Sequence, residues 1–138
     1  MAELFNTPEA ARIGLHAALI LAQRPDERWT INRLARTLSV SAAHLAKVLA
    51  QLEKAGLVKG KTGPTGGYLL ARPAKEISLL AVYQAVVGPV KVNHCPFAIP
   101  VCSGGCPVGN FLLQTNRQLV RYLKKTSLAA VRLNWEEK

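Results

Sequence analysis

The chain has 138 residues, a net charge of +10 and an apolar fraction of 49%. These values exclude a disordered chain and describe one domain that can bury a core without disulfides. The longest apolar stretch, residues 13–22, is too short to cross a bilayer, and Glu3 and Glu9 lie where a signal peptide would be positive. We therefore expect a cytoplasmic protein that does not enter membranes.

Most of the positive charge lies in one third of the chain. Nine basic residues occur between Arg28 and Lys75 and only Glu53 opposes them, so this segment has a net charge of +8. A compact basic block in a folded segment indicates a polyanionic partner such as nucleic acid. The alternative is a cationic surface that serves only solubility, and charge alone does not decide between the two.

The first helix is expected to run from Pro8 to about Gln23. Thr7 suits its N-cap position, and Pro8 suits its first helical position. Apolar residues surround much of this helix, which indicates burial in the core or against a second subunit. Its core stripe consists of Ile13, Ala17, Ile20 and Leu21.

Two further helices are predicted to form a helix-turn-helix pair. Thr30 is expected to cap a short helix over residues 31–38, and Ser41 is expected to cap a second helix that runs to Ala55. Gly56 follows as the glycine that ends this second helix. The second helix has one apolar stripe with helical spacing: Leu45, Val48, Leu49 and Leu52.

A β-hairpin and three more helices complete the predicted elements. Residues 57–61 and 68–71 predict two strands, and the glycines and proline of residues 63–67 predict a tight turn between them. Ser78 is expected to cap a helix over residues 79–87. A loop then holds every cysteine, a long helix runs from Val108 to Lys125, and Thr126 or Ser127 caps a final short helix.

This order predicts a mainly α fold with a small β-hairpin wing, a winged helix-turn-helix followed by a long dimerisation helix. We divide the chain into a DNA-binding domain (1–88), a cysteine-containing sensor loop (89–107) and a segment with the dimerisation helix and the final helix (108–138). Taken alone, the helix pair could be two packed core helices, and the strands could be an ordinary surface hairpin. Neither alternative explains why these elements occur in this order within the basic third of the chain. The expected apolar contacts of the dimerisation helix are Phe111, Leu112, Leu119 and Leu123.

The candidate DNA-binding residues follow from this fold. The outward face of the second helix of the pair would enter the major groove, where small side chains allow close approach and polar ones reach bases. The hairpin would follow the backbone or enter the minor groove. A two-fold dimer would bind double-stranded DNA at an inverted repeat, with about 10 bp or a multiple between half-site centres. The candidates are Ser41, Ala42, Ala43, His44 and Lys47 on the helix, and Lys59, Lys61, Thr62, Gly63 and Thr65 on the hairpin.

Several of these segments resemble one family. The run from Gly63 to Arg72, GPTGGYLLAR, resembles the wing signature of the IscR and NsrR family of bacterial transcription regulators, and residues 31–35 and 55–58 match as well. The resemblance implies a homodimer in which the long helices pair and the cysteine loop lies near the partner's first helix. Many members hold an iron–sulfur cluster there, and others respond through thiols or protein partners. One departure is Thr62, because IscR has an arginine at that place in the wing.

The three cysteines, Cys95, Cys102 and Cys106, lie within twelve residues. Clustered thiols in a reducing compartment suit an iron–sulfur cluster, zinc or a redox switch, or they are inert. The resemblance favours the cluster, which is readily lost on purification. Its type is not carried over, because six and three residues separate successive cysteines where the family commonly has five. Three thiolates leave one ligand missing; His16 of the partner subunit is the candidate, with an ordinary interface histidine as the alternative.

The leading hypothesis is a homodimeric transcription regulator, expected to be a repressor, whose operator affinity is controlled by the three-cysteine site. The alternative is a winged-helix regulator that is controlled by thiol oxidation or by a partner and holds no cluster. No enzyme is expected, because the chain has no Walker-type phosphate loop and no paired carboxylates. A partner-binding protein that uses the fold without DNA would lack the steep salt dependence of phosphate contacts.

Overall fold

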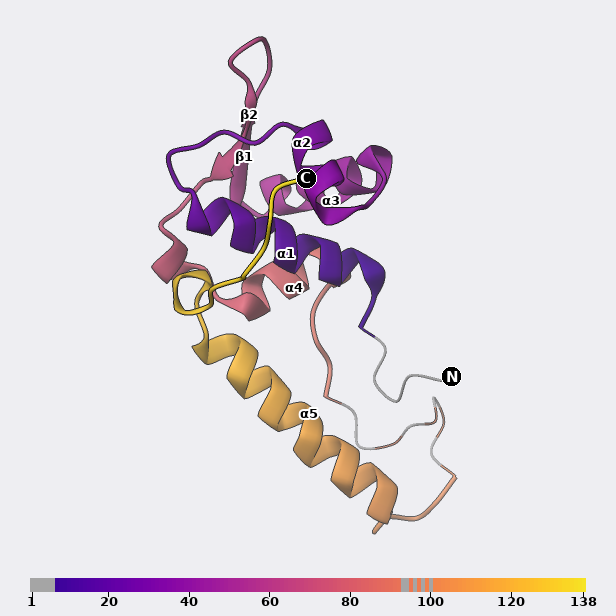
Figure 1. The fold of residues 1–138 in the computed structure, drawn as a ribbon. Coiled ribbons are helices and arrows are strands. Elements are labelled where there is room, and N and C mark those ends of the chain that lie inside the picture. The colour runs from indigo at the N-terminus through magenta and orange to yellow at the C-terminus, as the bar shows by residue number, and fades with distance from the viewer. Residues whose placement is uncertain (1–6, 93–94, 96, 98, 100) are drawn as a thin grey trace.

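The computed structural model describes residues 7–92, 95, 97, 99 and 101–138. Helices α1 to α4 and the hairpin form one body, and the longest helix, α5, extends away from it (Figure 1). This is the mainly α fold with a β-hairpin wing that the sequence predicts. The elements are α1 (Glu9–Gln23), α2 (Ile31–Leu38), α3 (Ala42–Lys54), β1 (Val58–Lys61), β2 (Gly67–Leu70), η1 (Ala74–Glu76), α4 (Leu79–Val87), α5 (Pro107–Lys125) and η2 (Leu128–Ala130), where η marks a 3₁₀ turn.

Side-chain caps begin three of the helices, as the sequence predicts. The hydroxyls of the capping residues accept the backbone N–H three residues further on at 3.0–3.2 Å; they are Thr30, Ser41 and Ser78. The prediction that Thr7 caps the first helix is wrong. Pro8 holds the N-cap position in an extended conformation, and its carbonyl accepts the N–H groups of Ala11 and Arg12. The helix therefore begins one residue later than the sequence predicts.

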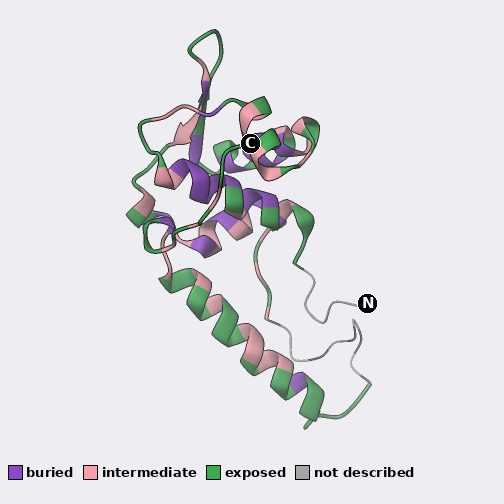
Figure 2. Cartoon of the chain, in the orientation of Figure 1, coloured by how far each residue is buried: buried purple, intermediate pink, exposed green. Residues whose placement is uncertain are grey.

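The core forms where α1 packs against α3 and α4 (Figure 2). The apolar stripes that the sequence predicts for α1 and α3 are fully buried. Burial of each large aliphatic side chain stabilises the fold by about 1.5–3 kcal/mol relative to exposure. Because the apolar stripe of α3 is buried, the opposite face of this helix is turned toward solvent. The buried stripe residues are Ile13, Ala17, Ile20, Leu21, Leu45, Val48, Leu49 and Leu52.

The wing is fixed to the segment before α2 through Trp29. Strands β1 and β2 pair antiparallel, each within one residue of its predicted limits. The sequence does not predict the next contact: the Trp29 N–H donates to the Tyr68 carbonyl at 3.1 Å, and the Trp29 carbonyl accepts the Tyr68 N–H at 2.8 Å. The Trp29 side chain is fully buried. The wing therefore rests on a buried residue of another segment.

Helix α5 leaves much of its apolar surface uncovered. Leu123 is half-buried and packs against the core of its own chain, so its contribution to a dimer interface stays a prediction. Four other apolar residues are 54–64% exposed, and their helical spacing places them on one face. We call them the α5 stripe: Val108, Phe111, Leu119 and Tyr122. No helix in the described part of the chain combines the length and apolar character that a membrane crossing requires.

The chain after α5 turns back toward the body. The predicted final helix is the single 3₁₀ turn η2, and Ser127 precedes it without a side-chain cap. Ser78 and Ser127 form an isolated antiparallel bridge that fixes this turn to the start of α4. Residues 131–138, which we call the return segment, then cross α1 and reach α2 (Figure 1).

Gly67→Ala is expected to destabilise the fold more than Gly63→Ala. Both glycines have positive φ, +130° and +99°, so alanine is strained at either position. A Cβ on Gly67 would also lie 2.9 Å from the backbone of Trp29, whereas a Cβ on Gly63 would meet open space. We expect urea unfolding to show losses of about 3 and about 1 kcal/mol. Equal losses would show that the close approach of Gly67 to Trp29 adds nothing to the destabilisation caused by the positive φ.

Candidate nucleic-acid interface and cysteine loop

The exposed face of α3 presents the residues that the sequence selects. Ser41, Ala43 and Lys47 are exposed, and Ala42 and His44 are half-buried. Ala42 packs against the core, so its methyl group is less accessible than the neighbouring one of Ala43. The short side chains at the start of α3 leave its first turn open to close approach by another molecule.

His44 lies at the edge of this face. Its Nδ1 is 4.0 Å from Oε2 of Glu9, at the start of α1. Lys47, one turn further along α3, forms no salt bridge with the described residues. Lys47 is therefore the lysine that the first two turns of α3 present to a polyanion, and His44 also contacts α1.

The wing supplies the second group of predicted residues. Lys59 and Lys61 are exposed on β1, and Thr62, Gly63 and Thr65 are exposed at the tip. The tip closes through a hydrogen bond from the Gly66 N–H to the Gly63 carbonyl at 2.9 Å. Two lysines and two hydroxyl groups thus lie on one projecting hairpin, as phosphate contacts require.

A groove of about 360 Å³ separates the wing from the helix pair. It is lined by the start of α2, the end of α3 and both strands: Thr30, Ile31, Asn32, Glu53, Gly60, Lys61, Thr62, Gly63, Gly66, Gly67 and Tyr68. The sequence does not predict that Asn32 and Glu53 lie next to the wing, because both are distant from the hairpin tip along the chain. Burial raises the pKa of the Tyr68 phenol, and the Glu53 carboxylate raises it further.

The cysteine loop meets α5 at Cys106. This residue is the N-cap of the helix, and its sulfur accepts the Gly109 N–H at 3.3 Å. A sulfur at this position lies near the positive end of the helix dipole, which stabilises negative charge there. Gly104 and Gly105, both with positive φ, lie in the bent segment between Cys102 and Cys106.

The structure brings two of the three thiols together. Cys102 is exposed and hydrogen-bonds to Cys106, and Cys95 is half-buried. Desolvation raises the pKa of the Cys102 thiol, and the sulfurs of Cys106 and Cys95 raise it further. Within the described residues, no three histidine, cysteine or acidic side chains are grouped closely enough to hold a metal ion.

His16 lies on α1 and is not grouped with the cysteines of its own chain. Its side chain is exposed, and its Nδ1 lies 2.7 Å from the carbonyl oxygen of Arg12. Donation from Nδ1 to this carbonyl places the lone pair on Nε2, the form of imidazole that binds metals. That His16 ligates a cluster from the partner subunit stays a prediction, because the contact would lie between two chains.

Comparison with known families gives one match over most of the chain. The sequence profile of the Rrf2 family, described as "Iron-dependent Transcriptional regulator", matches residues 8–132. A curated relative named as the HTH-type transcriptional regulator BadM, from Rhodopseudomonas palustris (strain ATCC BAA-98 / CGA009), is 41% identical over 69 residues. The aligned part is 50% of this chain and 44% of that relative, so it spans less than half the length of BadM.

Solved structures share the fold. CymR (YrzC), the global cysteine regulator of B. subtilis, has a TM-score of 0.75 at 22% identity, over 92% of this chain and 95% of that one. IscR of T. potens has a TM-score of 0.73 at 24% identity, over 92% and 85%. CymR of Staphylococcus aureus has a TM-score of 0.73 at 23% identity, over 92% and 99%. At these identities the likeness establishes a winged-helix fold and nothing about ligands.

Cys102 is expected to react with iodoacetamide at higher pH than an ordinary thiol, because its raised pKa lowers the thiolate fraction. Cys106→Ser should move the reaction profile of Cys102 part of the way back, since it removes one of the neighbouring sulfurs. Mass spectrometry of peptides from metal-free, reduced protein measures both profiles. A Cys102 profile that Cys106→Ser leaves unchanged would contradict the contact between the two thiols.

Proposed function

The chain belongs to the Rrf2 family of transcriptional regulators, and on that premise we propose that it is a homodimeric DNA-binding regulator controlled by its three-cysteine loop. Members of this family regulate transcription, and the chain is not an enzyme. The observation that carries the proposal is the joint exposure of Lys47 on α3 and of Lys59 and Lys61 on the wing. The partner is double-stranded DNA.

In this proposal α3 reads bases and the wing contacts the backbone. Ser41, Ala42, Ala43, His44 and Lys47 would face the major groove, since the buried stripe of α3 turns this side outward. The tip of the hairpin, with its small and hydroxyl side chains, would follow the phosphates or the minor groove. The wing residues that would make these contacts are Lys59, Lys61, Thr62, Gly63 and Thr65.

A second copy of the chain would cover the α5 stripe. An exposed apolar stripe along a 19-residue helix is typical of a helix that pairs with another. A two-fold pairing would place two α3 helices on one side of the dimer and give an operator with inverted symmetry. Leu112, which is half-buried at the edge of the α5 stripe, would complete the interface.

The cysteine loop would be the sensor. Cys95, Cys102 and Cys106 offer three thiolates, the donor type that iron–sulfur clusters prefer, and His16 of the partner subunit would supply the fourth ligand. A cluster in this loop would provide chemistry that responds to iron or oxidants. Because Cys106 caps α5, any change in the position of its sulfur acts directly on the first turn of the helix that pairs the subunits.

A second candidate is a thiol switch that needs no cluster. The hydrogen bond between Cys102 and Cys106 favours it, because two thiols in contact can form a disulfide when an oxidant removes two electrons and two protons. Absorption spectra with iron and sulfide analysis on anaerobically purified protein distinguish the two candidates. Stoichiometric iron and sulfide support the cluster, and their absence with a reversible Cys102–Cys106 disulfide supports the switch.

Leu119→Glu is expected to convert the dimer into a monomer, because it places a charge in the apolar interface of each subunit. Gln114→Glu introduces the same charge on an exposed position outside the α5 stripe and should leave the dimer intact. Sedimentation velocity at micromolar concentration measures both. A wild-type chain that sediments as a monomer would overturn the proposed pairing.

Lys47→Ala is expected to weaken operator binding by about 1–3 kcal/mol and nonspecific binding much less. Lys59→Ala should weaken both to a similar extent and reduce the salt slope by about one unit, because it removes one phosphate contact. Lys124→Ala, which removes the same charge from the C-terminal turn of α5, outside α3 and the wing, is the control. The operator is first selected from genomic fragments, and affinities are then measured over a salt series. Equal losses at both kinds of site for Lys47→Ala would show that α3 does not read bases.

Cys102→Ser is expected to abolish the cluster and to fix operator affinity at its cluster-free value, whatever the supply of iron or oxidant. The wild-type chain should show a difference of about 5- to 150-fold between the two states. His16→Ala should have the same effect if His16 is the fourth ligand, and otherwise the absorption spectrum stays intact. Operator affinity that still follows iron or oxidant in Cys102→Ser would refute control by the cysteines.

A further inference from the structure

The return segment, residues 131–138, reaches the helix-turn-helix pair from the end of α5. The turn η2, which precedes it, is fixed to the start of α4 by the bridge between Ser78 and Ser127. The return segment then crosses the end of α1, where the Gln23 amide donates to the Leu133 carbonyl at 3.1 Å and accepts the Leu133 N–H at 2.9 Å. The family profile ends at residue 132, so most of this segment lies beyond the part of the chain that the profile matches.

The middle of the return segment packs on Trp29. The ring of Trp135 meets that of Trp29 edge-on, with 5.5 Å between centroids and 68° between planes. The Arg24 guanidinium lies 4.9 Å from the Trp135 ring and 5.7 Å from the Trp29 ring, a distance at which cation–π attraction acts. Aromatic contact and cation–π contact thus hold the segment at the same place.

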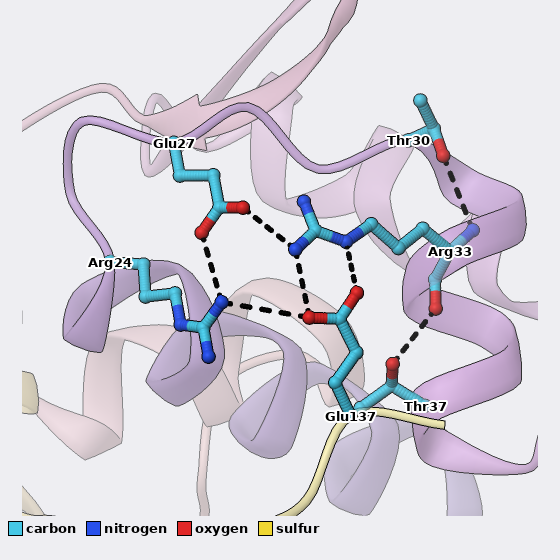
Figure 3. Close-up of polar contacts among 6 residues, drawn as sticks. All are labelled: Arg24, Glu27, Thr30, Arg33, Thr37 and Glu137. Atoms are coloured by element: carbon cyan, nitrogen blue, oxygen red, sulfur yellow. Dashed lines mark hydrogen bonds and ion pairs between the residues drawn. The ribbon is translucent and has the colours of Figure 1, made fainter.

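The end of the return segment is held by two arginines. Both carboxylate oxygens of Glu137 accept hydrogen bonds from Arg33 of α2, and Nη2 of Arg33 donates to Oε2 at 2.9 Å (Figure 3). Nη1 of Arg24 lies 3.6 Å from the same oxygen. Glu27 bridges the same arginines at 2.7 and 3.2 Å. Hydrogen bonds from Arg33 lower the pKa of both glutamates, Glu27 and Glu137, and Arg24 lowers each of them further. Both carboxylates therefore stay ionised near neutral pH.

This network reaches both parts of the proposed DNA-binding surface. The Arg33 guanidinium stacks 3.7 Å above the Trp29 ring and belongs to α2, the first helix of the pair. The backbone of Trp29 holds the wing through Tyr68. A single surface ion pair contributes little to stability. Here the bidentate contact of Arg33 with Glu137 and the stacking of Arg33 on Trp29 form a network that fixes the position of α2 relative to the return segment.

We propose that the return segment is a latch that holds α2 and the wing in the geometry that binds DNA. Trp135 and Glu137 are its positioning residues: they touch no DNA, and they act through Trp29 and Arg33. Because the segment continues from α5, the latch also connects the helix proposed to pair the subunits with the surface proposed to bind DNA. This inference rests on the proposed function.

The test uses the two tryptophans of the chain, Trp29 and Trp135, whose rings meet where the latch packs on the body. Glu137→Gln removes the ion pair with Arg33. Glu136→Gln is the matched control, because Glu136 is exposed and forms no salt bridge with the described residues. Both variants remove one negative charge, so a general effect of charge on DNA binding is the same in both. Intrinsic fluorescence reports the latch, and anisotropy of labelled operator DNA reports affinity.

We expect Glu137→Gln to change the tryptophan emission and to bind the operator about fivefold more weakly than Glu136→Gln. Trp135→Ala should also weaken operator binding, and Trp135→Phe, which keeps an aromatic ring, should restore most of it. Unchanged emission in Glu137→Gln would overturn the latch, as would equal operator affinity of the two glutamine variants. If the wild-type chain binds no DNA while Glu137→Gln still changes the emission, the proposed function fails and the latch contact stands.

Discussion

Trp29 is the residue on which the arrangement of the proposed DNA-binding surface depends. Its backbone pairs with Tyr68 of the wing, its ring is fully buried, and Arg33 of α2 stacks on that ring. Its indole Nε1 has no hydrogen-bond partner among the described residues, a cost that the packing of the ring must offset. The backbone pair between Trp29 and Tyr68 joins the wing to the segment that leads into α2, and the buried ring fixes this junction to the core.

The molecule separates its two proposed interaction surfaces by chemistry. Positive charge is concentrated on the helix pair and the wing, whereas the exposed apolar side chains of α5 lie on a helix that extends away from them. A polyanion is attracted to the first surface and a second apolar helix to the other, so the two partners do not compete. Between these surfaces the chain has two connections, the cysteine loop before α5 and the return segment after it.

These two connections differ in kind. The cysteine loop reaches α5 through Cys106, whose sulfur is part of the helix cap, so the chemistry of this thiol and the geometry of the helix start are linked. The return segment is linked to α2 by charges and rings and contains no reactive side chain. A signal at the cysteines would therefore act on one end of α5, and the latch would pass movement at the other end to the helix pair. Such coupling requires only that the two states differ in DNA affinity.

The sequence by itself determined the local elements. Hydroxyl caps, glycine stops and apolar periodicity place α2, α3 and α4 within a residue of their predicted bounds, because these signals act over a few neighbouring residues. They also select the exposed residues of α3 and the wing. The tertiary structure alone decided that Trp29 supports the wing, that Leu123 is used by its own core and that Glu137 reaches Arg33. The partners in these contacts are brought together by the packing of whole elements, and no short-range pattern in the sequence records that packing.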